Sequence, residues 1–395
     1  MARKPTKKEI RKNVWYLGLV SFLTDVSSEM IFPILPLFLS DVIQAPMSAI
    51  GLIEGMAEST ASILKLLSGW VSDKIGKRKP IIFLGYLAST ISKPFFALST
   101  TWWHVLVVRF TERVGKGLRT APRDALIAES VTSKTRGRAF GLHRTLDTAG
   151  AILGPILAFI LLNFFLTGDL SQQYRSLFWI SAIPAALAVI CILLFVKEIK
   201  PAKEKIRKIA VSTLSRNYKV LLLAVGLFSL ANFSYAFFIL RAQDVGVALA
   251  VIPLIYLFYN IVYAATAYPA GRLSDIVGRK PAVFFAYLLF ADVCLGFAIA
   301  PPGAIWQMWL MFALYGVFMA FFDTVQRAYV SDLVSSEKRA TALGAYHGVV
   351  GLGALPAGVV SGSLWQLFGP FAAFSFGLGV ALVAAAILLV FVREK

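Results

Sequence analysis

The chain has 395 residues, of which 58% are hydrophobic and only 15% are charged. A mean hydropathy of +0.74 excludes an ordinary soluble domain and predicts an integral membrane protein. The net charge of +18 would suggest nucleic-acid binding in a soluble protein. In a membrane protein it is explained by Lys and Arg in cytoplasmic loops, so we expect no nucleic-acid partner.

Twelve apolar runs follow one another along the chain, each long enough to cross a hydrocarbon core of about 30 Å. Lys and Arg concentrate in every second gap between these runs, which predicts that both termini are cytoplasmic. The compact loops and the lack of appended domains suit a multi-pass protein of a prokaryotic plasma (inner) membrane. The pattern predicts an all-α membrane fold of twelve helices. The expected spans are 14–40, 48–72, 80–99, 102–126, 138–166, 175–196, 219–243, 247–271, 280–300, 304–330, 340–367 and 370–393.

The longest polar segment, between the sixth and seventh runs, divides the chain into similar halves. We therefore expect an N-terminal six-helix bundle over 1–198, a cytoplasmic linker over 199–218 and a C-terminal six-helix bundle over 219–395. SKTRGRAFG at 133–141 matches SEKRATALG at 336–344, which indicates an internal repeat.

A second repeat is more specific, because GWVSDKIGKRKP at 69–80 recurs as GRLSDIVGRKP at 271–281. Each copy lies between two apolar runs and predicts a tight, basic cytoplasmic turn. The two copies resemble the signature loop of the major facilitator superfamily. That resemblance implies two pseudo-symmetric six-helix bundles that alternate access to a site near the bilayer midplane. The residues predicted to form the cytoplasmic gate are Gly69, Asp73, Gly76, Arg78, Gly271, Asp275, Gly278 and Arg279.

Ionisable residues inside the expected spans of the first half are the next signal. Each costs roughly 2.5 to 3.5 kcal/mol at a helix centre, so they are expected to face inward and to pair or to act in coupling. They either neutralise one another as a buried network or exchange partners as a proton-coupling network. The residues assigned to this network are Asp25, Glu29, Glu54, Glu58, Arg109, Glu112, Arg113, Arg144 and Asp147.

The fourth expected helix carries Arg109 and Glu112, which match the first two positions of a motif that the superfamily often places there. Arg113 stands where that motif usually has Gly. Farther along, Arg123 and Asp124 are expected at the cytoplasmic end, where pairing with Asp73 is an alternative to substrate binding.

The fifth expected helix carries a glycine pattern made of Gly141, Gly150, Gly154 and Pro155. The pattern resembles the antiporter motif of drug-exporting members, with Ala158 and Phe159 in place of its last glycine pair. Small residues at this spacing let two helices approach closely. Packing alone also explains them, but the resemblance favours antiport over uptake.

Aromatic and polar residues line expected helices of the second half. A cavity with charges on one wall and aromatic rings on the other favours an amphipathic organic solute. The residues predicted to line the cavity are Lys65, Lys116, His143, Asn232, Tyr235, Tyr256, Asn260, Tyr263 and Gln326.

These features predict a monomeric secondary transporter that exports a small amphipathic organic compound in exchange for protons. The sequence shows no GxxxxGK[ST] loop and no evident nucleophile with a partner base, so we expect neither an enzyme nor a cofactor. It shows no His-rich loop or compact ligand motif either, so we expect no resident metal. Three alternatives stay open. One is a transporter-like sensor; another is uptake of an anionic metabolite held by Arg109, Arg113, Lys116 and Arg144. The third is efflux of a divalent metal through Asp25, Glu29, Glu54, Glu58, His143, Asp147 and His347.

Overall fold

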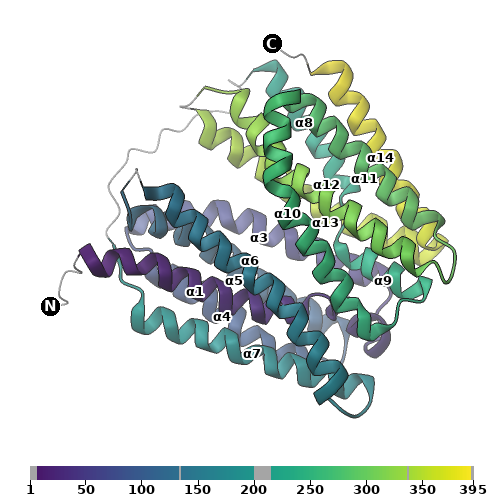
Figure 1. Ribbon diagram of the computed structural model, residues 1–395, viewed down its shortest axis with the longest axis horizontal. Helices are drawn as coiled ribbons and strands as arrows, with labels where there is room; N and C mark the ends of the chain where they lie inside the picture. Colours follow the sequence, from purple (N-terminus) through teal and green to yellow (C-terminus); the bar gives the residue numbers. More distant parts are fainter. Residues whose placement is uncertain (1–6, 133–134, 200–214, 336–337, 393–395) are drawn as a thin grey trace. The chain divides into compact units, whose positions relative to one another are not determined.

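The computed structural model describes residues 7–132, 135–199, 215–335 and 338–392, and the regular structure in these ranges is helical throughout. Figure 1 labels the helices. The first half contains α1 (Lys7–Ile31), α2 (Leu35–Leu37), η1 (Phe38–Val42), α3 (Met47–Ile75), α4 (Lys79–Leu98), α5 (Trp102–Glu129), α6 (Arg136–Ile160), η3 (Leu161–Phe165) and α7 (Leu170–Phe195). The second half contains α8 (Arg216–Ala231), α9 (Tyr235–Val245), η5 (Leu249–Val251), α10 (Ile252–Val277), α11 (Arg279–Ile299), α12 (Ile305–Asp332), α13 (Arg339–Phe368) and α14 (Pro370–Phe391).

The all-α membrane fold predicted from the sequence is confirmed. Within the described ranges, ten helical segments are long and apolar enough to cross a membrane. Helices α3 and α5 have the length, with 29 and 28 residues, but carry many of the charges discussed below. Residues 200–214 of the expected linker, and parts of the repeat at 133–141 and 336–344, lie outside the described residues.

Two expected helices are interrupted. The run predicted as one helix over 14–40 is broken: α1 ends at Ile31, and helical structure begins again at Leu35. The break occurs because Pro33 has no N–H with which to continue the hydrogen-bond ladder. The run predicted over 219–243 breaks between α8 and α9. There the Ser234 hydroxyl accepts a hydrogen bond from the Ala236 amide at 3.3 Å and caps the new helix.

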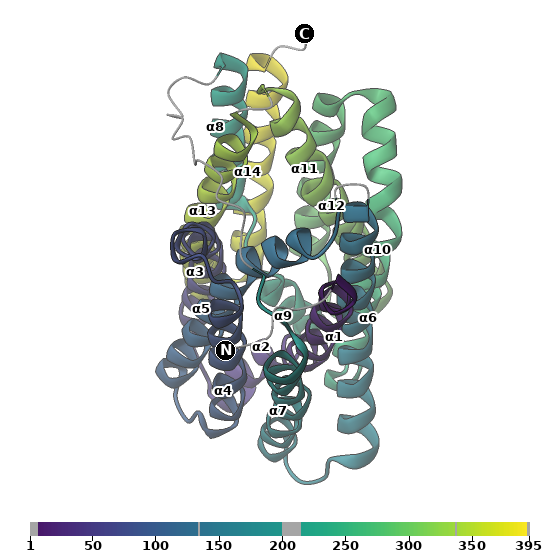
Figure 2. The same ribbon diagram turned by 90° about the vertical axis from the view of Figure 1, so that its left-hand side faces the viewer.

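The chain divides into two compact units. Unit 1 comprises Met1–Ile43 and Thr60–Lys205. Within it α1 packs on α6 and α7, and α4 packs on α5 and α7, as Figures 1 and 2 show. Gly85 and Gly115 let α4 and α5 touch through their backbones, because a Cβ at Gly85 would lie 2.7 Å from the Gly115 carbonyl oxygen. This close contact brings the charged face of α5 against α4.

Unit 2 comprises Gln44–Ser59 and Ile206–Lys395. Helix α8 packs on α13 and α14, α10 packs on α12, and α11 packs on α12 and α14. Phe228 stacks on Tyr287 with ring centroids 4.0 Å apart and also contacts Phe290 and Phe318. This aromatic core holds the helices of unit 2 together through large buried apolar surfaces.

The N-terminal part of α3 belongs to unit 2 through its contact with α13. Gly51 and Gly358 meet backbone to backbone, and a Cβ at Gly55 would lie 2.7 Å from the Ala354 carbonyl oxygen. The Ser59 hydroxyl donates to the Gly351 carbonyl and accepts from the Leu355 amide at 3.1 Å. Ser59 thereby enters the hydrogen-bond ladder of α13, and Glu54 and Glu58 on the same stretch of α3 are fixed within unit 2.

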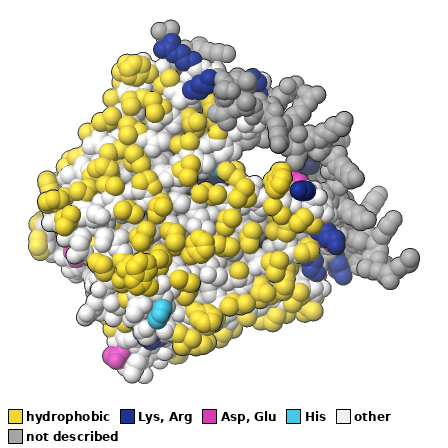
Figure 3. Space-filling model, turned by 180° about the vertical axis from the view of Figure 1, so that it is seen from behind, with side chains coloured by type: hydrophobic (Ala, Val, Ile, Leu, Met, Phe, Trp, Pro, Cys, Tyr) yellow, Lys and Arg dark blue, Asp and Glu magenta, His cyan; other side chains and the backbone are white. Residues whose placement is uncertain are grey.

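The outer surface is apolar. Leu194 is 62% exposed and Trp306 is 71% exposed, and Figure 3 shows hydrophobic side chains spread over the viewed face with the Lys and Arg side chains toward its edges. Exposed apolar side chains of this extent are suited to lipid rather than to water.

Candidate functional site

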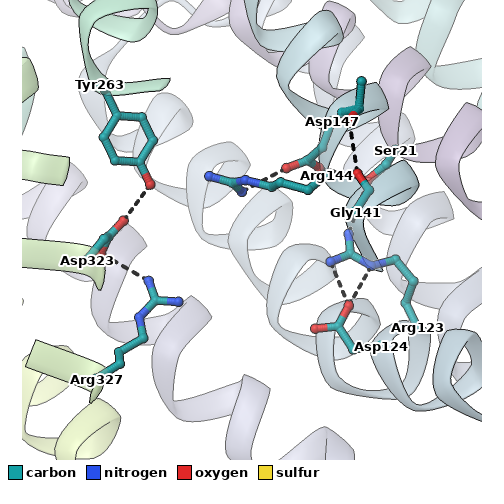
Figure 4. A network of polar contacts seen from close by, with 10 residues as sticks. Ser21, Arg123, Asp124, Gly141, Arg144, Asp147, Tyr263, Asp323 and Arg327 are labelled. Atoms are coloured by element: carbon teal, nitrogen blue, oxygen red, sulfur yellow. Dashed lines mark hydrogen bonds and ion pairs between the residues drawn. The ribbon is translucent and has the colours of Figure 1, made fainter. Parts of the chain in front are cut away.

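Two carboxyl groups meet in unit 1, one from α1 and one from α6. The side chain of Asp25 lies within hydrogen-bonding reach of the side chain of Asp147. Ser21 donates a hydrogen bond to Asp147 Oδ1 at 3.0 Å, and Arg144 Nη1 pairs with Asp147 Oδ2 at 3.0 Å. Figure 4 shows Ser21, Arg144 and Asp147 grouped in this way. Because a hydrogen bond between two carboxyl groups requires one proton, this arrangement can store a proton.

Two glycines of α6 bring these carboxyl groups together. A Cβ at Gly150 would lie 2.5 Å from the Phe22 carbonyl oxygen and 3.0 Å from Asp25 Cβ. At Gly154 it would lie 2.7 Å from Glu29 Cβ. Gly150 and Gly154 therefore fit α6 against the acidic face of α1.

The other members of the antiporter-like pattern are placed differently. Pro155 is buried within α6. Gly141 is exposed, and a Cβ there would meet nothing within 4 Å. Close helix packing therefore involves only part of this pattern.

A second cluster in unit 1 centres on Glu112 of α5. Arg109 and Arg113 both pair with Glu112 Oε2, at 3.2 and 3.3 Å. Both guanidinium groups also lie over the ring of Phe32, at 4.6 and 5.1 Å from its centroid. All three charged residues are buried. Ion pairing and cation–π contact stabilise the charges of this cluster, and the contact with Phe32 connects α5 to the break after α1.

Arg123 has other partners than Asp73. It donates to Asp124 Oδ1 at 2.9 Å and to the Ser21 hydroxyl at 3.2 Å, so Ser21 links it to Asp147 (Figure 4). His143 is buried nearby, and its Nε2 atom has no hydrogen-bond partner among the described residues. Lys65 and Glu29 are half-buried, whereas Lys116 is exposed.

The sequence offers Lys93 as a basic partner for the buried acids, and in the structure it is fully buried on α4, facing α1. Its Nζ atom donates to the hydroxyls of Ser27 and Ser28 at 2.5 and 3.0 Å, and Ser27 in turn donates to the Ser181 carbonyl of α7. The available signal was a lysine in the middle of an otherwise apolar run. The hydroxyl partners on α1 cannot be recognised before the helices are packed.

In unit 2, tyrosines from α9, α10 and α12 form a row of ring contacts, here called the tyrosine ladder. Ring centroids are 5.3 Å apart for Tyr235 and Tyr256, 5.7 Å for Tyr256 and Tyr259, and 6.5 Å for Tyr259 and Tyr263. Tyr315 joins the ladder at 5.1 Å from Tyr259. Asn260 lies on α10 between these rings, and Asn232 ends α8.

A carboxylate terminates the ladder. The Tyr263 hydroxyl donates to Asp323 Oδ2 at 3.0 Å, and Arg327 pairs with Asp323 Oδ1 at 3.1 Å, as Figure 4 shows for these three residues. Asp323 and Arg327 were not assigned to the site from the sequence, although both stand out as charges within an apolar run.

Gln326 and the two acids of α3 complete the polar groups of unit 2. Gln326 is fully buried, donating to the Tyr287 hydroxyl at 3.2 Å and accepting from the Tyr346 hydroxyl at 3.0 Å. Its side chain is therefore part of a core network. Glu54 is buried and accepts from the Ser234 hydroxyl at 3.2 Å, whereas Glu58 is exposed.

The two copies of the repeated cytoplasmic motif have matching ion pairs. Arg78 pairs with Asp73 at 2.5 Å and with Glu129 at 2.9 Å. Burial disfavours the Arg78 charge, but hydrogen bonds and charges of Glu129 and Asp73 outweigh this effect and raise the Arg78 pKa. Gly76 has a φ of +68°, a turn conformation that side chains disfavour. A Cβ at Gly69 would just touch Ala121, at 3.4 Å.

In the second copy, Arg279 pairs with Asp275 at 2.5 Å and with Asp332 at 3.0 Å. Gly278 has a φ of +97°, whereas a Cβ at Gly271 would meet nothing within 4 Å. The first copy is thus tied to the end of α5 through Glu129, and the second copy to the end of α12 through Asp332. Among the described residues, no group of three or more His, Cys, Asp or Glu side chains is placed to hold a metal ion.

Comparison with known proteins places these features in a family. The family model described as Major Facilitator Superfamily matches residues 17–240 and 220–395. An uncharacterised MFS-type transporter of Methanocaldococcus jannaschii is 42% identical over 392 residues, covering 97% of this chain and 95% of the relative. A class H tetracycline resistance protein of Pasteurella multocida is 24% identical over 318 residues, 75% of each chain. The crystal structure of the nucleoside transporter NupG has a TM-score of 0.78 at 17% identity, covering 97% of this chain and all of that one, which shows a shared fold.

Proposed function

The chain belongs to the major facilitator superfamily, and we propose that it exports a small amphipathic organic compound in exchange for protons. The bundles expected at 1–198 and 219–395 are the bodies that alternate access, joined by the linker at 199–218. The protein acts as a monomer in the plasma membrane, with both termini in the cytoplasm and no cofactor.

The contact between Asp25 and Asp147 is the observation that supports proton coupling. Burying a carboxyl pair inside a membrane helix bundle is costly, and ionisable residues in such places mark functional sites. A proton held between the two groups removes one of their charges, which reduces their mutual repulsion. Ser21 orients Asp147 through its hydrogen bond, so the pair is held in place by α1 and α6 together.

Arg144 supplies a way to couple the proton to conformation. Its side chain is 62% exposed while that of Asp147 is 20% exposed, so the guanidinium is the partner that can leave. A nearby cation favours the ionised form of a carboxylate. Loss of the Arg144 contact therefore strengthens proton binding at the pair, and its return weakens proton binding.

Export is supported by the placement of Gly150 and Gly154. These members of the antiporter-like pattern fit α6 against the helix that carries Asp25 and Glu29. The relative named for tetracycline resistance supports an organic substrate. Arg109 and Arg113, two of the four residues expected to clamp an anionic metabolite, are instead both paired with Glu112. This pairing favours the organic-compound hypothesis over anion uptake.

Proton release from the purified protein tests this function. Organic cations, neutral organic compounds and organic anions are added in turn to the protein in weakly buffered detergent solution, and the pH is followed. At least one compound that binds should release protons, and the release should be lost in Asp25→Asn and Asp147→Asn. Asp169→Asn is a matched control, because Asp169 is an exposed helix cap and Asn also caps helices. Binding without release for every compound would contradict proton exchange at this pair.

A further inference from the structure

We infer that a small inorganic anion, with chloride as the simplest example, binds inside unit 1 beside Lys93 of α4 and Arg119 of α5. The inference goes beyond the proposed function, because it concerns a bound ion and not the transported compound.

Lys93 and Arg119 are buried cations whose partners are neutral. Lys93 is 1% exposed and Arg119 is 5% exposed. Among the described residues, Lys93 donates to the hydroxyls of Ser27 and Ser28, Arg119 donates to the hydroxyl of Ser89, and neither cation forms an ion pair with a carboxylate. Neutral hydroxyls offset only part of the cost of burying a charge, whereas a counter-ion offsets much more of it.

The two cations act on one region of unit 1, because they lie within electrostatic range of each other. Two positive groups in a low-dielectric helix bundle repel one another, and an anion near both relieves this repulsion. The Arg119 guanidinium also lies over the ring of Tyr86, at 4.5 Å from its centroid. This contact positions the guanidinium but does not supply a negative charge.

The acids around Lys93 do not replace a counter-ion. Three of them lie within electrostatic range of its ammonium group, and none forms an ion pair with it. They are Glu112, Asp25 and Glu29. Glu112 has the largest effect of the three, but Arg109 and Arg113 both pair with it. The positive charge of Lys93 therefore remains without a direct counter-charge.

Hydrogen-bond donors are also left over at this place. Lys93 carries three N–H groups, of which two go to Ser27 and Ser28. The hydroxyls of Ser27 and Ser89 already donate to backbone carbonyl groups, whereas the hydroxyl hydrogen of Ser28 has no acceptor among the described residues. One N–H of Lys93, the Ser28 hydroxyl and the guanidinium of Arg119 can thus donate to an anion.

Burial limits the size of the ion. Helices α4 and α5 touch through Gly85 and Gly115, and the side chains of Lys93 and Arg119 are almost fully buried. A monatomic anion suits such a site, whereas a larger organic anion would require the helices to separate. Chloride is therefore the appropriate probe, with bromide as a heavier ion of similar size.

Thermal unfolding of the purified full-length chain in detergent tests the inference. Sodium chloride replaces sodium gluconate stepwise at constant ionic strength, so that only the anion changes. An ion that binds the folded state raises the midpoint by mass action. We expect a rise of roughly 2 to 4 °C once chloride is several-fold above its Kd. The same midpoint in both salts would overturn the inference, because Lys93 and Arg119 would then be buried without a counter-ion.

Substitutions locate the ion. Lys93→Met and Arg119→Gln each remove one cation and should lose most of the chloride-dependent rise. Ser28→Ala keeps both cations but removes a donor, and it should weaken chloride binding about tenfold. Arg241→Gln is the matched control. It removes a guanidinium of unit 2 that donates to backbone carbonyls at the end of α11, and it should keep the rise even if its own midpoint is lower. A rise that survives in both Lys93→Met and Arg119→Gln, or that is lost equally in Arg241→Gln, would refute this site.

Anomalous diffraction provides a test that needs no substitution. Crystals of the unaltered protein grown with bromide in place of chloride should show an anomalous peak next to Lys93 Nζ and Ser28 Oγ. Bromide-containing crystals without a peak at this position would refute the site, even if Lys93→Met and Arg119→Gln fail to fold.

Discussion

Replacing Gly150 with Ala should separate the carboxyl pair by pushing α6 away from α1. The added Cβ would lie 2.5 Å from the Phe22 carbonyl oxygen and 3.0 Å from Asp25 Cβ. Both contacts involve atoms on or next to the backbone, so the helices rather than a flexible side-chain end must shift. Overpacking of this kind costs about 1 to 3 kcal/mol.

Gly141→Ala is the matched control for this prediction. It makes the same change on the same helix, but the new Cβ meets nothing within 4 Å, and Ala favours a helix over Gly by about 1 kcal/mol. Thermal unfolding in detergent should therefore show a lower midpoint for Gly150→Ala and an equal or higher one for Gly141→Ala. Ligand-induced proton release should fall only in Gly150→Ala. Identical behaviour of the two variants would refute the argument that Gly150 sets the distance between Asp25 and Asp147.

Three further substitutions test other contacts. Glu112→Gln removes the negative charge that pairs with the buried Arg109 and Arg113. It should destabilise the protein by about 3 to 5 kcal/mol, which thermal unfolding would show as a large drop in the midpoint. A drop no larger than that of Asp169→Asn would show that Glu112 does not stabilise the arginines. Lys93→Met removes the donor to the Ser27 and Ser28 hydroxyls. Loss of these buried hydrogen bonds should lower stability by about 1 to 3 kcal/mol, whereas a higher midpoint would mean that the cost of burying the amine exceeds the gain from its contacts. Arg78→Lys loses the forked pairing with Asp73 and Glu129 and should slow transport in vesicles, whereas Lys77→Arg should not. Because the pKa of Arg78 is raised, its charge persists from about pH 6 to 9 and the defect should be the same over that range; a pH-dependent defect would point to another group.

Much of the fold is predictable because a bilayer constrains sequence strongly. Apolar runs of membrane-spanning length and the alternation of basic gaps predict the helices, and the paired motifs at Gly69 and Gly271 indicate the family, which the family match confirms. The breaks after α1 and α8 were missed. Pro33 was available as a signal for the first, but the second, at Asn232, depends on a Ser234 cap that is hidden within an apolar run.

The partners of the site residues were less accessible to sequence analysis. Asp25 and Asp147 each stand out as acids within apolar runs, but their contact depends on which helices are neighbours, and helical periodicity does not specify this. The same holds for Lys93, whose hydroxyl partners lie on another helix. For Gln326, the polar side chain predicted a position on the cavity wall. In the structure its amide group is instead hydrogen-bonded to the hydroxyls of Tyr287 and Tyr346.

Infrared difference spectroscopy tests the central claim most directly, because a protonated carboxyl group has a C=O stretching band that a carboxylate lacks. At neutral pH the ligand-free protein should show this band, and it should disappear in Asp25→Asn and in Asp147→Asn, and on binding of a ligand that releases protons. Asp169→Asn should leave it unchanged. A band that persists in both Asp25→Asn and Asp147→Asn, or the absence of any such band in the ligand-free protein, would contradict a proton held between these two residues.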